Sequence, residues 1–130
     1  MKDSSARLQW CESFCTGITA VDEQHQTVLL LYNDVLRALE RRASPYMVAE
    51  TIDSLVYFLR RHFAWEERLM ADSGFERLAE HAAGHARFDT VARAFYSYLG
   101  LGDGGESFAR FARTWILEHF TADREIAAAE

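Results

Sequence analysis

The chain has 130 residues, of which 49% are apolar and 13% aromatic, enough for one globular domain with a hydrophobic core. Its net charge of −6 and its scattered basic residues argue against nucleic acid, because phosphate binding needs a clustered basic face. The first residues lead into no signal segment, and no apolar run approaches the roughly 20 residues of a membrane span. We therefore expect a single cytoplasmic domain over 1–130, with no membrane partner.

Residues 1–18 show no steady hydrophobic period and contain Trp10, Phe14 and Gly17, which predicts an ordered N-terminal arm. Cys11 and Cys15 lie within it. A reducing cytoplasm disfavours a structural disulfide, and a CxxxC pair alone is a poor zinc signature. We expect two free, partly buried thiols.

A first amphipathic helix is expected after the arm, where Thr19 and Asp22 resemble a capping box. Its apolar face repeats at four- and three-residue steps, through Val21, His25, Val28, Tyr32, Val35 and Leu39. Ser44-Pro45 predicts the start of a second helix, since serine is a good N-cap and proline suits the first helical position. The second face comprises Val48, Ile52, Leu55, Leu59, His62, Glu66 and Leu69, and Ser73-Gly74 breaks it.

A third face follows as Leu78, His81, His85, Phe88, Ala92, Phe95 and Leu99. The four glycines of 100–105 predict a turn. A fourth face comprises Phe108, Ala112, Trp115, His119, Asp123 and Ile126. Four such helices with short connections predict an all-α, up-down-up-down four-helix bundle over about 19–127.

All five histidines of the chain fall on these inward faces, together with Glu66 and Asp123. One histidine on an apolar face is usually an ordinary core residue. Burying an unpaired polar group costs about 1–3 kcal/mol, however, and an uncompensated charge costs more. Five imidazoles and two carboxylates in one core therefore predict bound divalent cations.

The residue types narrow the choice of metal. Seven nitrogen and oxygen ligands exceed the four of a structural zinc site, and all-oxygen calcium or magnesium sites do not use imidazole. Mixed imidazole and carboxylate ligation in a four-helix core fits two iron or manganese ions bridged by carboxylates. Neither the Glu-x-x-His of ferritin-like proteins nor the HExxH of zinc proteases occurs. A histidine-rich pair of ions remains.

Four motifs in order resemble the hemerythrin family, specifically the single-domain bacteriohemerythrins, across essentially the whole chain. They are Trp10…Gly17…Val21-Asp22-Glu23-Gln24-His25, His62-Phe63-x-x-Glu66-Glu67-x-x-Met70, His81-x-x-x-His85 and Trp115-Ile116-x-x-His119-Phe120. The resemblance implies a non-haem di-iron centre that binds O2 reversibly.

The resemblance also implies roles for single residues. His81, His85 and His119 would hold one iron, and His25 and His62 the other. Glu66 and Asp123 would bridge the two ions, with an oxo or hydroxo group as the third bridge. The iron with two histidines would keep one open position, where O2 would bind.

Further residues are candidates for the surroundings of the centre. Those for an apolar O2 pocket are Val28, Phe63, Trp115, Ile116 and Phe120, with ordinary core packing as the alternative reading. Those for hydrogen bonds to the ligating histidines are Asp22, Gln24, Glu67 and Glu118.

Three features depart from the family pattern. The final aspartate usually lies five residues after its histidine, but here Arg124 occupies that position and Asp123 lies four residues after His119. On an ideal helix the fourth residue shares the histidine's face better than the fifth. The usual tyrosine three residues beyond the aspartate is missing, and Phe75-Glu76 replaces an aromatic-proline pair.

We expect an O2-binding protein for storage, delivery or sensing, acting as a monomer and not as an enzyme. No spare histidine or cysteine remains on the inward faces to serve as an acid–base catalyst. The alternatives are a di-iron enzyme acting on peroxide, nitric oxide or O2, and an iron-storage or detoxification module. The expected partner is O2 itself.

Overall fold

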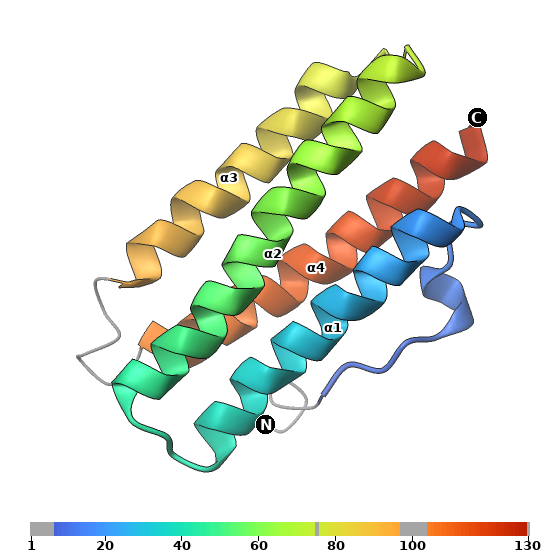
Figure 1. The fold of residues 1–130 in the computed structure, drawn as a ribbon. Helices are drawn as coiled ribbons and strands as arrows, with labels where there is room; N and C mark the ends of the chain where they lie inside the picture. The colour runs from blue at the N-terminus through green and yellow to red at the C-terminus, as the bar shows by residue number, and fades with distance from the viewer. Residues whose placement is uncertain (1–6, 75, 97–103, 130) are drawn as a thin grey trace.

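The computed structural model describes residues 7–74, 76–96 and 104–129, which form four helices and no strand. A short 3-10 turn, η2 (Glu12–Phe14), precedes α1 (Thr19–Glu40), α2 (Pro45–Asp72), α3 (Leu78–Tyr96) and α4 (Gly104–Ala129). Successive helices run in opposite directions, and the arm lies along α1 and α4 (Figure 1). The predicted up-down-up-down bundle is confirmed, and no helix among these residues is long and apolar enough to cross a membrane.

The second helix begins and ends where the sequence predicts. Ser44 is its N-cap, and the side chain accepts a hydrogen bond from the Met47 N–H at 3.2 Å. Pro45 follows at a position whose N–H has no intrahelical acceptor. At the other end Gly74 takes a φ of 72°, a left-handed conformation that glycine adopts without strain.

The start of α1 differs from the predicted capping box. Ile18 is the N-cap and makes no side-chain capping bond, so Thr19 is already helical. Gly17, with a φ of 89°, turns the arm back. Asp22 Oδ1 then accepts hydrogen bonds from the backbone N–H and the hydroxyl of Thr16, at 2.9 and 2.8 Å. Asp22 therefore ties the arm to the helix instead of closing a local box.

Three smaller expectations are also corrected. Cys11 and Cys15 are free but exposed, because Trp10 and Phe14 make the arm's contacts with the core. Leu69 is 40% exposed and Met70 is buried in its place, since a 3.6-residue helix drifts away from a strict heptad pattern. Gly104 and Gly105 already belong to α4, whereas Leu99 and 100–103 lie outside the described residues.

The core is divided along the length of the bundle. One half is apolar and includes the fully buried Tyr32, Leu55, Leu59 and Phe108. The buried polar residues come from the N-terminal halves of α1 and α3 and the C-terminal halves of α2 and α4. Because neighbouring helices are antiparallel, these four segments meet at the same end of the molecule.

The cap of α2 offers a test of this reading of the fold. Replacing Ser44 by Ala leaves an N–H at the start of α2 without its acceptor, so we expect the free energy of unfolding to fall by about 1 kcal/mol. Urea unfolding followed by circular dichroism measures the change. Ser44→Asp, which keeps an acceptor oxygen, should unfold close to wild type, and equal midpoints for all three proteins would contradict the capping role.

Candidate metal centre

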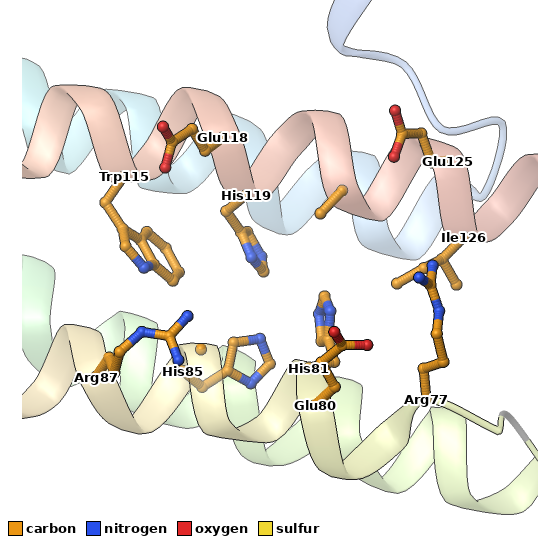
Figure 2. A pocket seen from close by; sticks show the side chains of 12 residues that line it. Arg77, Glu80, His81, His85, Arg87, Trp115, Glu118, His119, Glu125 and Ile126 are labelled. Carbon is orange, nitrogen blue, oxygen red and sulfur yellow. The ribbon is translucent and has the colours of Figure 1, made fainter.

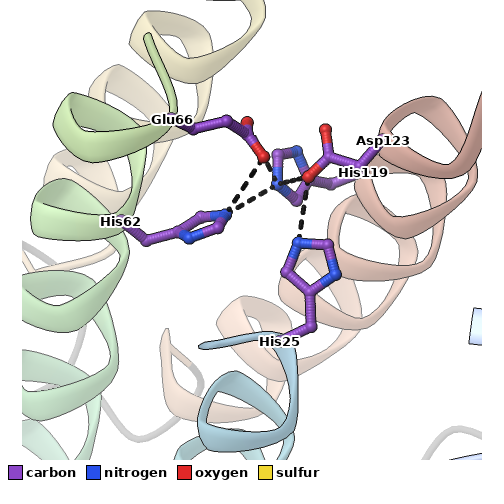
Figure 3. A group of neighbouring side chains, drawn as sticks. All are labelled: His25, His62, Glu66, His119 and Asp123. Atoms are coloured by element: carbon purple, nitrogen blue, oxygen red, sulfur yellow. Dashed lines mark hydrogen bonds and ion pairs between the residues drawn. The ribbon is translucent and has the colours of Figure 1, made fainter. Parts of the chain in front are cut away.

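The structure brings all seven predicted ligand residues together at one end of the bundle. His25 comes from α1, His62 and Glu66 from α2, His81 and His85 from α3, and His119 and Asp123 from α4. Figure 3 shows the side chains from α1, α2 and α4 pointing toward one another. Six of the seven residues are buried, and His81 is half-buried.

Their nitrogen and oxygen atoms form two overlapping groups, each within 4.8 Å. One group comprises His25, His62, Glu66, His119 and Asp123, and the other comprises Glu66, His81, His85 and His119. Glu66 and His119 belong to both groups. Two groups of ligand atoms with shared members provide room for two ions close together, although they do not assign each histidine to one ion.

Glu66 lies between the two groups. Its Oε1 is 2.9 Å from His81 Nε2 and 3.1 Å from His85 Nε2. Its Oε2 faces the other side and lies 3.5 Å from His62 Nε2. A carboxylate whose two oxygens face different sets of imidazoles has the geometry of a bridging ligand.

Asp123 is placed in a similar way despite its unusual spacing. Its Oδ2 lies 2.9 Å from both His25 Nε2 and His119 Nε2, and its Oδ1 lies 3.2 Å from His81 Nε2. Because α4 is regularly α-helical here, the fourth residue after His119 points the same way as that histidine. Arg124 points elsewhere and donates a hydrogen bond to the Ser13 carbonyl at 2.9 Å.

The donor atoms fit a cation better than they fit one another. His62 Nε2 lies only 3.3 Å from His119 Nε2, and two neutral imidazoles that both present lone pairs there would repel. His85 Nε2 and Asp123 Oδ1 are buried without a hydrogen-bond partner among the described residues. A divalent ion would accept these lone pairs, and nitrogen with oxygen donors suits iron.

Charge and burial set the protonation of the metal-free centre. Burial alone raises the pKa of Glu66, but hydrogen bonds with Asp123 and the surrounding histidines outweigh it and hold that pKa far below its usual range. Burial alone lowers the pKa of His81, but hydrogen bonds to Asp123 and Glu66 raise it to about 9. Since a ligating imidazole must be neutral, a metal ion bound by His81 would have to displace this proton.

Two of the four predicted hydrogen-bond partners contact the histidines. Gln24 Oε1 lies 2.7 Å from His62 Nδ1, and Glu67 Oε2 lies 2.8 Å from His85 Nδ1. An acceptor oxygen at each Nδ1 favours the tautomer with the proton on Nδ1, which leaves the Nε2 lone pair for the centre. Asp22 binds Thr16 instead, and Glu118 lies on the exposed side of α4.

Three of the five predicted pocket residues stack on ligand imidazoles. Phe63 lies 4.1 Å from the His85 ring at 5°, Phe120 lies 4.3 Å from His25 at 18°, and Trp115 lies 4.7 Å from His119 at 12°. Val28 and Ile116 are buried in the adjoining core. The three stacking contacts fix the planes of the imidazole rings. That these five residues form a pocket for O2 stays a prediction.

A different set of residues surrounds an apolar cavity of about 180 Å³ that reaches the two carboxylates. We call it the end cavity. It is lined by Thr16, Ile18, Val21, Glu66, Leu69, Met70, Ser73, Asp123, Ile126 and Ala127. The sequence carries no clear signal for it, because its walls come from the arm and from helix ends that meet only in the folded chain.

The contact between Gln24 and His62 can be tested through metal affinity. Gln24→Ala removes the acceptor that orients His62, so we expect binding of Fe²⁺ or Co²⁺ to weaken about 10–100-fold with unchanged stoichiometry. Competition with a chromogenic chelator measures the affinity. Gln26→Ala, on the exposed side of the same helix, is the matched control; equal affinities for the two variants would remove Gln24 from this role.

Comparison with known proteins agrees with this geometry. The chain is 29% identical over 119 residues to the Bacteriohemerythrin of Pseudomonas paraeruginosa, covering 91% of this chain and 77% of the relative. It is 31% identical over 112 residues to the Hemerythrin-like protein of Naegleria gruberi, with coverages of 86% and 83%. The Myohemerythrin of Riftia pachyptila is 28% identical over 110 residues, with coverages of 85% and 82%. Residues 16–129 match the Hemerythrin HHE cation binding domain, and the chain therefore belongs to that family.

Proposed function

We propose that this protein binds O2 reversibly at a pair of iron ions and acts as a carrier, store or sensor of O2, not as an enzyme. The observation that carries the proposal is the end cavity, an apolar space that reaches the two carboxylates between the ligand groups. The names of the relatives, Bacteriohemerythrin and Myohemerythrin, support it.

In this proposal His81, His85 and His119 hold one ion, and His25 and His62 hold the other. Glu66 and Asp123 bridge them, since each presents its two oxygens to different histidines. The ion with two histidines is left with one fewer protein ligand than its neighbour. When bound, the ferrous pair supplies two electrons that O2 takes up on binding and returns on release.

The residues of the chain tune this site in three ways. Gln24 and Glu67 hold the proton of a ligating histidine on Nδ1. Phe63, Phe120 and Trp115 each stack on one imidazole and hold its plane. The end cavity admits a small neutral molecule more readily than an ion, because an ion would lose its hydration against apolar walls.

The distribution of reactive side chains favours a carrier over an enzyme. The chain has five histidines, and all five lie in the ligand groups. Both cysteines lie in the arm, with exposed side chains. No histidine or cysteine is therefore left over beside the centre to transfer protons to a substrate.

The proposal is tested by loading the protein with iron under anaerobic conditions, reducing it and admitting O2. We expect two irons per chain and a visible charge-transfer absorption that appears with O2 and disappears on deoxygenation. Glu66→Ala, which removes a carboxylate shared by both groups, should neither retain two irons nor give the absorption. Immediate irreversible oxidation, or turnover of peroxide, would overturn the carrier, and one bound ion would overturn the pair.

The route through the end cavity gives a separate prediction. Ala127 lines the cavity, so Ala127→Leu should narrow it and slow the rise of the O2-dependent absorption several-fold without changing iron content. Stopped-flow absorbance measures the rate. Ala128→Leu places the same side chain on the exposed neighbour and should bind O2 at the wild-type rate. Equal rates for the two variants would show that O2 reaches the centre by another path.

A further inference from the structure

A second opening reaches the centre between two of its helices. A cleft of about 330 Å³ lies between α3 and α4, and Figure 2 shows imidazoles from both helices facing into it. We call it the α3–α4 cleft. Its lining residues include His81, His85 and His119, with Arg77, Glu80, Gly84, Arg87, Trp115, Glu118, Ala122, Glu125 and Ile126 around them.

His81 is the ligand residue that solvent reaches first. Its side chain is 11% exposed, whereas the other six ligand side chains are at most 5% exposed. His85, behind it on α3, is buried and directs an Nε2 without a hydrogen-bond partner toward the centre. An ion that enters here therefore meets the accessible imidazole of His81 first, and then the buried His85, whose Nε2 makes no hydrogen bond among the described residues.

The charges along this path suit a cation. The cleft residues Glu80, Glu118 and Glu125 are exposed carboxylates, and they outnumber the guanidinium groups of Arg77 and Arg87. Behind them stand the two buried carboxylates of the centre. The three cleft glutamates and the two buried carboxylates together exceed the two arginines, so the path carries a net negative charge, and a net negative potential raises the local concentration of cations.

We infer that the α3–α4 cleft is the entry through which hydrated divalent metal ions load the centre, with His81 as the first ligand and Glu80, Glu118 and Glu125 as guides. This inference rests on the proposed di-iron centre and assigns it a loading route separate from the end cavity. A hydrated ion loses water in stages here, because carboxylates and an accessible imidazole replace that water before the ion reaches the buried ligands.

Gly84 permits a steric test of the route. A Cβ at this position would meet Arg87 Nη2 at 3.6 Å, an ordinary contact, so a side chain can be accommodated within the cleft. Gly84→Leu should narrow the entry, whereas Gly84→Ala should leave it open. Both variants keep all seven ligand residues.

The experiment mixes metal-free full-length protein with Co²⁺ in a stopped-flow instrument. Quenching of the tryptophan fluorescence reports arrival, because Trp115 stacks on His119 and Trp65 lies 6.1 Å from the His62 ring. The cleft triple variant carries Glu80→Gln, Glu118→Gln and Glu125→Gln. We expect it to load about tenfold more slowly than wild type at low salt, because charged clefts raise association rates by roughly tenfold or more. The matched control Glu12→Gln/Glu50→Gln/Glu106→Gln removes equal charge from exposed positions outside the cleft and should load at nearly the wild-type rate.

We expect the cleft triple variant to load Co²⁺ more slowly than its control, and this difference in rate to shrink as added salt shortens the Debye length. We also expect Gly84→Leu to load more slowly than Gly84→Ala. Final occupancy should stay at two Co²⁺ per chain throughout. Equal rates for the two triple variants, with Gly84→Leu as fast as Gly84→Ala, would overturn the entry route. If the wild-type protein binds fewer than two Co²⁺ per chain, the di-metal proposal is contradicted. The loading rates of the variants would still test the entry route for the ion that does bind.

Discussion

The burial of two carboxylates among five imidazoles is the constraint on which the rest of this structure depends. Glu66 and Asp123 are each about one-twentieth exposed, and their oxygens lie within hydrogen-bond distance of histidine nitrogens from four helices. An uncompensated charge at this depth would cost several kcal/mol. Every helix therefore has to bring its polar residues to the same level, and the apolar half of the bundle supplies the packing that holds them there.

Secondary contacts limit how the imidazoles can turn. Gln24 and Glu67 fix the Nδ1 side of two rings, and stacked aromatic residues fix the planes of three. Four of these five contacts come from a neighbouring helix, whereas Trp115 lies one turn before His119 on α4. Preorganised ligand atoms lose less conformational entropy when an ion binds, so the same packing that stabilises the bundle also favours metal binding.

The two openings of the centre differ in the chemistry of their walls. The end cavity is mostly apolar and reaches the carboxylates, whereas the α3–α4 cleft is charged and reaches the histidines. Under the two proposals, this division would let a neutral ligand and a metal ion approach the centre by different openings. The arm takes part in it, because Thr16 and Ile18 form one wall of the end cavity while Arg124 and Asp22 hold the arm in place.

Four helices, their order and their buried histidines could be predicted from the sequence, because helical periodicity and residue type are local properties. Ser44-Pro45 and Gly74 marked the ends of α2 for the same reason. Local patterns gave wrong predictions where the outcome depends on distant contacts. Asp22 binds Thr16 of the arm, Met70 is buried where Leu69 was expected, and the side chains of Cys11 and Cys15 are exposed to solvent. Only the tertiary structure decided that Glu66 and His119 belong to both ligand groups and that two openings reach them. These features depend on the relative rotation and height of separate helices, and side-chain packing across the whole bundle sets both.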